Sequence, residues 1–218
     1  MAVILGQSLS QIVVLVIAVI LSMSIHEAAH GLVSYWFGDP TARQAGRLSL
    51  NPLAHIDWSG LLCLLLFGFG WAKPVPVDPS YYKDPKAGMI WTAFAGPVAN
   101  FLLGFVCVFL YYLLLKLAPG FAFGTVGSFV ESVFATTAIL STGFGIFNLI
   151  PVPPLDGSKI LFAFLPDQEY YRVTRGTPWM YILFIALLWS GLISGPIGML
   201  RGAMIDAFSS AAMFLLGM

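Results

Sequence analysis

The sequence predicts an all-α protein that crosses a membrane several times, and three observations support this fold class. Of the 218 residues, 59% are apolar and only 9% are charged, whereas soluble domains carry about 25% charged residues. The mean hydropathy is +0.89. Charge-free stretches are long enough to cross a hydrocarbon core, which takes about 20 helical residues. They are residues 1–25, 87–115, 132–155 and 176–200.

The same composition excludes several classes of function. Ten Lys and Arg residues balance ten Asp and Glu residues, so the net charge is zero. A nucleic-acid-binding protein needs a basic surface, and a soluble enzyme needs more polar surface than this chain offers. We therefore expect a lipid bilayer around the protein and no nucleic-acid partner. The length fits a single domain over residues 1–218, with a core at 8–157 and C-terminal helices at 176–218.

A short uncharged stretch follows the first predicted span. Residues 58–72 carry no charge, but their apolar part, 61–69, is too short to cross the bilayer. We expect a hairpin that dips into the membrane and returns. The proline-rich residues 71–79 lack several amide donors, so they predict an extended edge or loop. Taken alone, this stretch favours a connector, and the alternative is a β edge that pairs with an extended peptide.

The positive residues predict the orientation. In all we expect about five to six transmembrane helices; residues 202–218 could span the membrane or lie flat on it. If residues 58–72 return to the side they left, eight of the ten Lys and Arg residues lie on one face, the others being Lys116 and Arg201. Cytoplasmic loops carry the excess of positive charge. The N-terminus is therefore expected outside, with the basic face in the cytoplasm.

Two histidines and a glutamate interrupt the first apolar run. His26 and His30 are four residues apart, so on a helix both rings lie on one face and can reach one zinc ion. Glu27, the neighbouring position, can hold a water molecule. Ionisable groups within a membrane span are costly and mark functional sites by default. The alternative is a chance occurrence of this spacing, which the absence of other ionisable groups in the span disfavours.

A catalytic zinc site needs a third protein ligand. Asp156 is the best candidate, because it follows a run in which prolines break the helix at residues 151–154. With the predicted orientation, the first span and the span at 132–155 both run inward, so Asp156 and the two histidines reach a similar depth. The alternative is that Asp156 is only a helix-end or interface residue. For His55, a role in a loop or behind the ligands is favoured over direct ligation.

Two asparagines complete the candidate site, and each has two interpretations. Asn100 follows Gly96 and Pro97 inside an apolar span, and Asn148 begins the proline-rich run. Such residues can mark a kink or close helix packing. Their amides can instead donate to a reaction oxyanion or to a substrate carbonyl.

Taken together and in this order, the motifs resemble those of the site-2 protease family of intramembrane zinc metalloproteases. The chain is similar to the minimal form of that family, without a PDZ or CBS domain. The matching segments contain residues 26–30, 46–57, 70–77, 95–100 and 148–157.

The resemblance implies a site and an activity. His26, His30 and Asp156 would bind one Zn²⁺ per chain, and Glu27 would be the catalytic glutamate. Asn100 and Asn148 would help to hold the substrate or groups near the zinc. The proline-rich stretch would be membrane-associated β-structure beside the active site.

We therefore expect a zinc metalloendopeptidase of the cell membrane. Its substrates would be membrane proteins, cleaved within or near their transmembrane segments, with the active site towards the cytoplasm. The alternatives are an inactive membrane scaffold or a zinc carrier that uses the same site. Assembly into a homo-oligomer is left open by the sequence.

Overall fold

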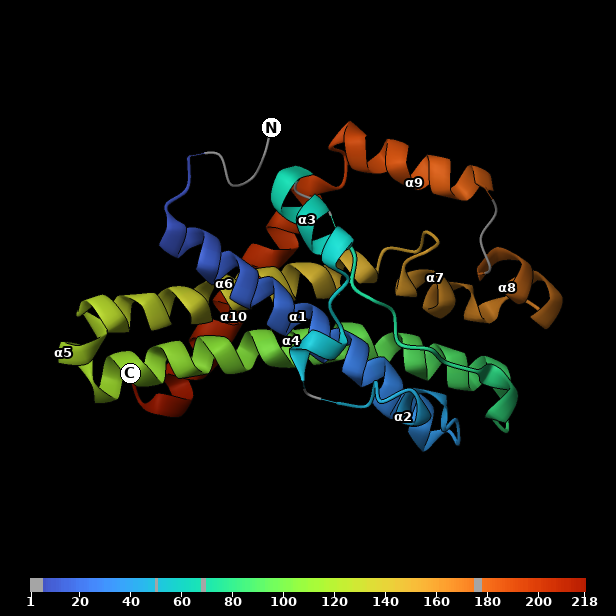
Figure 1. The fold of residues 1–218 in the computed structure, drawn as a ribbon, viewed down its shortest axis with the longest axis horizontal. Helices are drawn as coiled ribbons and strands as arrows, with labels where there is room; N and C mark the ends of the chain where they lie inside the picture. The colour runs from blue at the N-terminus through green and yellow to red at the C-terminus, as the bar shows by residue number, and fades with distance from the viewer. Residues whose placement is uncertain (1–5, 50, 68–69, 175–177) are drawn as a thin grey trace.

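Three long helices form the centre of the computed structural model, which describes residues 6–49, 51–67, 70–174 and 178–218. These are α1 (Leu9–Trp36), α4 (Pro85–Leu117) and α6 (Thr125–Asn148), and each packs against the other two. Helix α10 (Ser194–Leu216) packs on α4 and α6. Figure 1 shows α4 and α6 side by side, with α1 crossing them on one face and α10 on the other.

Among the residues that the structure describes, these four helices are the ones long and apolar enough to cross a membrane. The predicted spans 87–115 and 132–155 correspond to α4 and α6, and the span 1–25 corresponds to the first part of α1. Local sequence fixes where α4 begins. Asp84 accepts a hydrogen bond from the amide of Ala87, 3.0 Å away, and Pro85 occupies the first turn.

The prediction of one membrane-spanning helix at residues 176–200 is wrong, because two helices share this stretch. Helix α9 covers Pro178–Ser190, 13 residues or about 20 Å, which is too short to span. It ends at Ser190, and the next residue, Gly191, has a φ of +72° that breaks the helix. Residues 202–218 lie almost entirely in α10, which includes Arg201. The described part of the chain thus has four spanning-length helices, against the five to six that we expected.

Short elements connect the long helices. They are α2 (Thr41–Gln44), η1 (Pro52–Ala54), α3 (Trp58–Phe67), η2 (Pro79–Tyr81), α5 (Pro119–Ala122), α7 (Asp156–Leu161), η3 (Phe162–Phe164) and α8 (Asp167–Thr174). Parts of three predicted segments, at residues 1–5, 68–69 and 176–177, lie outside the described residues.

The chain returns on itself after α3, as the predicted hairpin requires. A Cβ atom added to Gly60 would lie 2.1 Å from the carbonyl oxygen of Trp71, so the two backbones are in contact. The amide of Lys73 then donates to the carbonyl of His55 at 3.0 Å. The structure therefore confirms the return of the chain.

Residues 73–78, which we call the strap, do not form the expected β-structure. No strand is assigned to them or to any other described residue. Prolines at 74 and 76 have no amide hydrogen to donate. Two of the remaining amides, those of Val75 and Asp78, donate to the side chains of Glu27 and Asp39. The strap is therefore held by carboxylates instead of by a neighbouring strand.

Candidate metal centre

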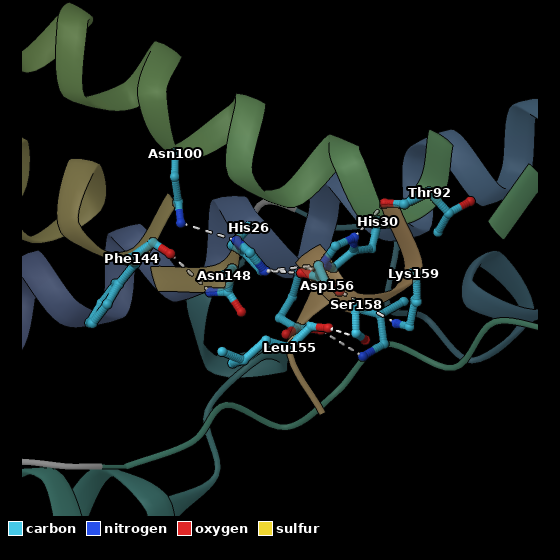
Figure 2. Close-up of polar contacts among 12 residues, drawn as sticks. His26, His30, Thr92, Asn100, Phe144, Asn148, Leu155, Asp156, Ser158 and Lys159 are labelled. Atoms are coloured by element: carbon cyan, nitrogen blue, oxygen red, sulfur yellow. Dashed lines mark hydrogen bonds and ion pairs between the residues drawn. The ribbon is translucent and has the colours of Figure 1, made fainter. Parts of the chain in front are cut away.

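Helix α1 and the start of α7 bring three potential metal ligands together. His26 and His30 lie one helical turn apart on the same face of α1, and Asp156 is the first residue of α7. Asp156 Oδ2 lies 3.2 Å from Nε2 of each histidine, and the two Nε2 atoms are 3.0 Å apart. Figure 2 shows the three side chains pointing toward one another. Residues 130 positions apart in sequence thus lie beside one another.

The spacing of these atoms fits a zinc ion. Tetrahedral zinc with bonds of about 2.0–2.1 Å keeps its ligand atoms about 3.3 Å apart. The triangle formed by His26, His30 and Asp156 has edges of 3.0–3.2 Å. Two imidazole nitrogens and one carboxylate oxygen are also a donor set that zinc accepts, and three protein ligands leave a fourth position open.

The outer nitrogens of both imidazoles have partners on α4. His30 Nδ1 lies 2.6 Å from the carbonyl oxygen of Thr92, which can only accept a hydrogen bond. With a metal bound at Nε2, His30 would therefore keep its proton on Nδ1 and direct the lone pair of Nε2 into the site. The amide group of Asn100 lies 3.0 Å from His26 Nδ1, and Ser141 donates to the backbone oxygen of Asn100 at 2.9 Å. Asn100 and Ser141 are wholly buried.

The two rings press against α4 at Gly96. A Cβ atom added there would lie 2.5 Å from His26 Cε1 and 2.6 Å from His30 Cε1. Real Cβ atoms do not approach other atoms so closely, and a helix backbone cannot withdraw locally to make room. A residue without a side chain is therefore required at this point of α4.

A tight fold of the chain positions Asp156. A Cβ atom added to Gly157 would lie 2.2 Å from the carbonyl oxygen of Leu149, so α7 starts directly against the end of α6. Burial raises the pKa of the Asp156 carboxyl group. The positive charge of a protonated His30 and the hydrogen bonds from the donors around the carboxylate lower this pKa by a larger amount. The net effect is a pKa below the ordinary value. The carboxyl group is therefore ionised at neutral pH, which is the form that binds metal.

Glu27 lies next to His26, His30 and Asp156, which we call the ligand group, and the strap crosses the edge of this group at Glu27. Its Oε2 accepts a hydrogen bond of 2.8 Å from the amide of Val75. Both residues line a cavity of about 230 Å³, open to solvent, that also includes His26, His30 and Asp156. The other lining residues are Pro74, Val77, Met89, Thr92, Ala93, Asn148, Pro154 and Lys159.

The remaining predicted residues lie in different places. Asn148 lines this cavity, and its Nδ2 donates to the carbonyl of Phe144 at 3.0 Å. Asn100 does not line the cavity but lies behind His26. His55 is outside the ligand group; its Nε2 donates to the carbonyl of Ser49 at 2.9 Å, in agreement with a role in a loop.

Sequence reasoning missed four contributors to the site. Gly96 was noted only as a mark of a kink or of close packing, and Thr92 acts through its backbone, which the side chain does not reveal. Val75 contributes an amide that only the fold brings to Glu27. Lys159 had a detectable signal, because it lies three residues after Asp156 and a helix places such pairs on one face.

Comparisons with known proteins identify the family of the chain. The model of the family described as "Peptidase family M50" matches residues 14–127 and 122–190. "Putative zinc metalloprotease YwhC" of Bacillus subtilis (strain 168) is 37% identical over 177 residues, which are 79% of this chain and 78% of that protein. "Putative zinc metalloprotease Rip2" of Mycolicibacterium smegmatis is 26% identical over 78% of this chain and 64% of its own. No solved structure gives a significant match.

Proposed function

The chain belongs to peptidase family M50 and is a metalloprotease, and we propose that it cleaves membrane proteins within or near their transmembrane segments. We further propose that His26, His30 and Asp156 hold a single zinc ion and that Glu27 is the catalytic residue. The observation that carries this proposal is the convergence of three ligand atoms, 3.0–3.2 Å apart, on helices that qualify as membrane spans or adjoin one.

Zinc bound in such a site lowers the pKa of a coordinated water towards about 7 and polarises a carbonyl group. The protein supplies the proton transfers. Glu27 lies next to the ligands and faces the same cavity, so its carboxylate can take a proton from the attacking water and pass it to the leaving amine. The amide of Val75 holds only Oε2 of Glu27, which leaves Oε1 for this task.

The position of the strap bears on how a substrate is held. A transmembrane helix has its amides bonded internally, so it must unwind locally before a carbonyl can react. The unwound segment can then lie along the strap. Because Val75 and Asp78 already use their amides on carboxylates and Lys73 uses its own on His55, the strap offers mainly carbonyl acceptors. The substrate would therefore supply most of the donors.

The cavity is proposed to open on the cytoplasmic side of the cell membrane, with the N-terminus outside. Support comes from the positive-inside rule together with the observed return of the chain after α3, which keeps Arg43, Arg47 and Lys73 on the same face. Water then reaches the ligands from the cytoplasm.

The test combines metal analysis with cleavage of a panel of single-span substrates in reconstituted membranes. Glu27→Gln removes the proton acceptor but none of the three ligands. We expect this variant to retain zinc and to lose cleavage by about 10²–10⁴-fold, the usual contribution of a general base. A zinc carrier would keep its transport activity in the variant, and a scaffold would keep its binding to a partner. Cleavage at the wild-type rate by Glu27→Gln would refute the proposed role of Glu27.

A further inference from the structure

We propose that Lys159 is a positioning residue that holds the Asp156 carboxylate in the orientation needed for metal binding. The inference rests on the proposed zinc site. Lys159 Nζ lies 3.4 Å from Asp156 Oδ1, while Oδ2 of the same carboxylate faces both imidazoles at 3.2 Å. The two oxygens are thus divided between two tasks, with Oδ1 directed to the ammonium group and Oδ2 to the metal position.

The contact differs from an ordinary pair of charges on a helix surface. Exposed pairs three residues apart contribute little, because water competes for both groups. Here the Asp156 side chain is only 10% exposed and the Lys159 side chain 28%. Lys159 also lines the cavity that contains the ligands. Figure 2 shows its amino group beside Asp156, on the side away from His26.

Lys159 completes a pattern that extends over the whole ligand group. The carbonyl of Thr92 fixes the ring of His30, and the amide of Asn100 fixes the ring of His26. Among the described residues, Lys159 is the group that contacts the second oxygen of Asp156. Each ligand is therefore oriented by one partner that does not itself point at the metal position. Partners of this kind typically change metal affinity by about 10–100-fold when removed.

The lysine also bears on how the carboxylate binds. A free carboxylate can rotate and bind an ion through both oxygens, which would occupy the position needed by water. An ammonium group on Oδ1 opposes that rotation, so Asp156 binds through Oδ2 alone. Loss of Lys159 should therefore alter the number of coordinating atoms as well as the affinity.

The experiment uses the full-length protein in detergent, with Co²⁺ as a spectroscopic probe and Zn²⁺ in competition. We expect Lys159→Met to weaken zinc binding by about 10–100-fold and to lower the visible absorption of the cobalt form, since four-coordinate Co²⁺ absorbs more strongly than species of higher coordination. Lys159→Arg restores a cation at the same place and should recover most of the affinity and the spectrum. Lys83→Met, on an exposed lysine, is the matched control and should behave as wild type.

The outcomes separate this inference from the proposed function. Wild-type affinity and an unchanged cobalt spectrum in Lys159→Met would overturn the role of Lys159 while leaving the zinc site intact. A wild-type protein that binds neither metal would overturn the zinc site itself. If Lys159→Met does not fold, Lys159→Gln provides the same measurement, and an unaltered spectrum there overturns the inference equally.

Discussion

His26, His30 and Asp156 can act as a metal site only if neighbouring groups hold their side chains in the right orientation and protonation state. An imidazole that binds a metal through Nε2 carries its proton on Nδ1 and needs an acceptor there. For His26 the group in that place is the amide of Asn100, at 3.0 Å. With metal bound, the oxygen of this amide is the atom expected to face Nδ1. Of the two roles expected for Asn100, holding the substrate or holding groups near the zinc, this contact with His26 favours the second.

This role predicts the effect of removing the amide. Asn100→Leu leaves the proton on His26 Nδ1 without an acceptor in a fully buried position. We expect zinc affinity to fall by about 10–100-fold, measured by competition with a chelating dye. Thr137→Val is the control, because Thr137 is equally buried and its hydroxyl makes no hydrogen bond. Equal affinity in Asn100→Leu and wild type would exclude the role.

The sequence indicated the three proposed ligands but not the residues that contact them, for a physical reason. A spacing of four residues places His26 and His30 on one face of any helix, so the pair is visible in the sequence. The partners depend on which turn of α4 lies against α1. That register is set by the close approach at Gly96, a property of the packed helices.

The strap borders the site and is also anchored at Asp39, beyond the site. Asp39, which follows the end of α1, is fully buried and accepts hydrogen bonds from Ser34 Oγ, the amide of Asp78 and the amide of Thr41. Burial by itself raises the pKa of Asp39. The hydrogen bonds from Thr41, Asp78 and Ser34 outweigh burial, so its pKa is lowered below the ordinary value of 3.8.

A lowered pKa makes the anchor dependent on pH. The ionised form of Asp39 stabilises the fold at any pH above the ordinary value of 3.8, and this contribution is lost as the pH falls from there through the lowered value. We expect the thermal stability of the protein in micelles to drop below about pH 4, and Asp39→Asn to lack this part of the drop. Glu169→Gln, an exposed substitution, should keep the wild-type profile. An identical acid response in Asp39→Asn would contradict the assignment.

Charge-free stretches located α1, α4 and α6, because burial in lipid excludes charge from long apolar helices. The same criterion failed at 176–200, since it cannot detect a turn without charges. Gly191, with its positive φ, divides that stretch, and α10 runs on past Arg201. Residues 71–79 form the connector that their prolines favoured, and the β-structure implied by the resemblance is absent from them. The residues that accept hydrogen bonds from the amides of Val75 and Asp78, Glu27 and Asp39, are distant in sequence.

The arrangement of the helices makes the proposed orientation testable. Figure 1 shows α2 and the start of α4 at one end of the bundle and α5 at the other. In protein lacking its native cysteines, Ala45→Cys and Pro85→Cys should react with an impermeant reagent from the cytoplasmic side. Phe123→Cys, beyond the other end of α4 and exposed, should react from outside. Opposite accessibility of positions 45 and 85 would contradict the return of the chain to one face.

The convergence of the two parts of the site was predictable because the first and third spans run in the same direction. The contacts that enclose the site could not be predicted from the sequence. Helix α7 starts against the end of α6 at Gly157, and the strap crosses the edge of the ligand group beside Glu27. Both features arise from contacts between segments far apart in sequence.

The close packing at Gly96 also restricts the path to the open coordination position. With α4 filling the space behind both imidazoles, neither a carbonyl group nor a water molecule can come in from that direction. The approach must be from the opposite side, where the strap and Lys159 border the cavity. In the proposed protease, a substrate would therefore have to present its scissile bond between the strap and α7, because Gly96 lets α4 close the opposite side.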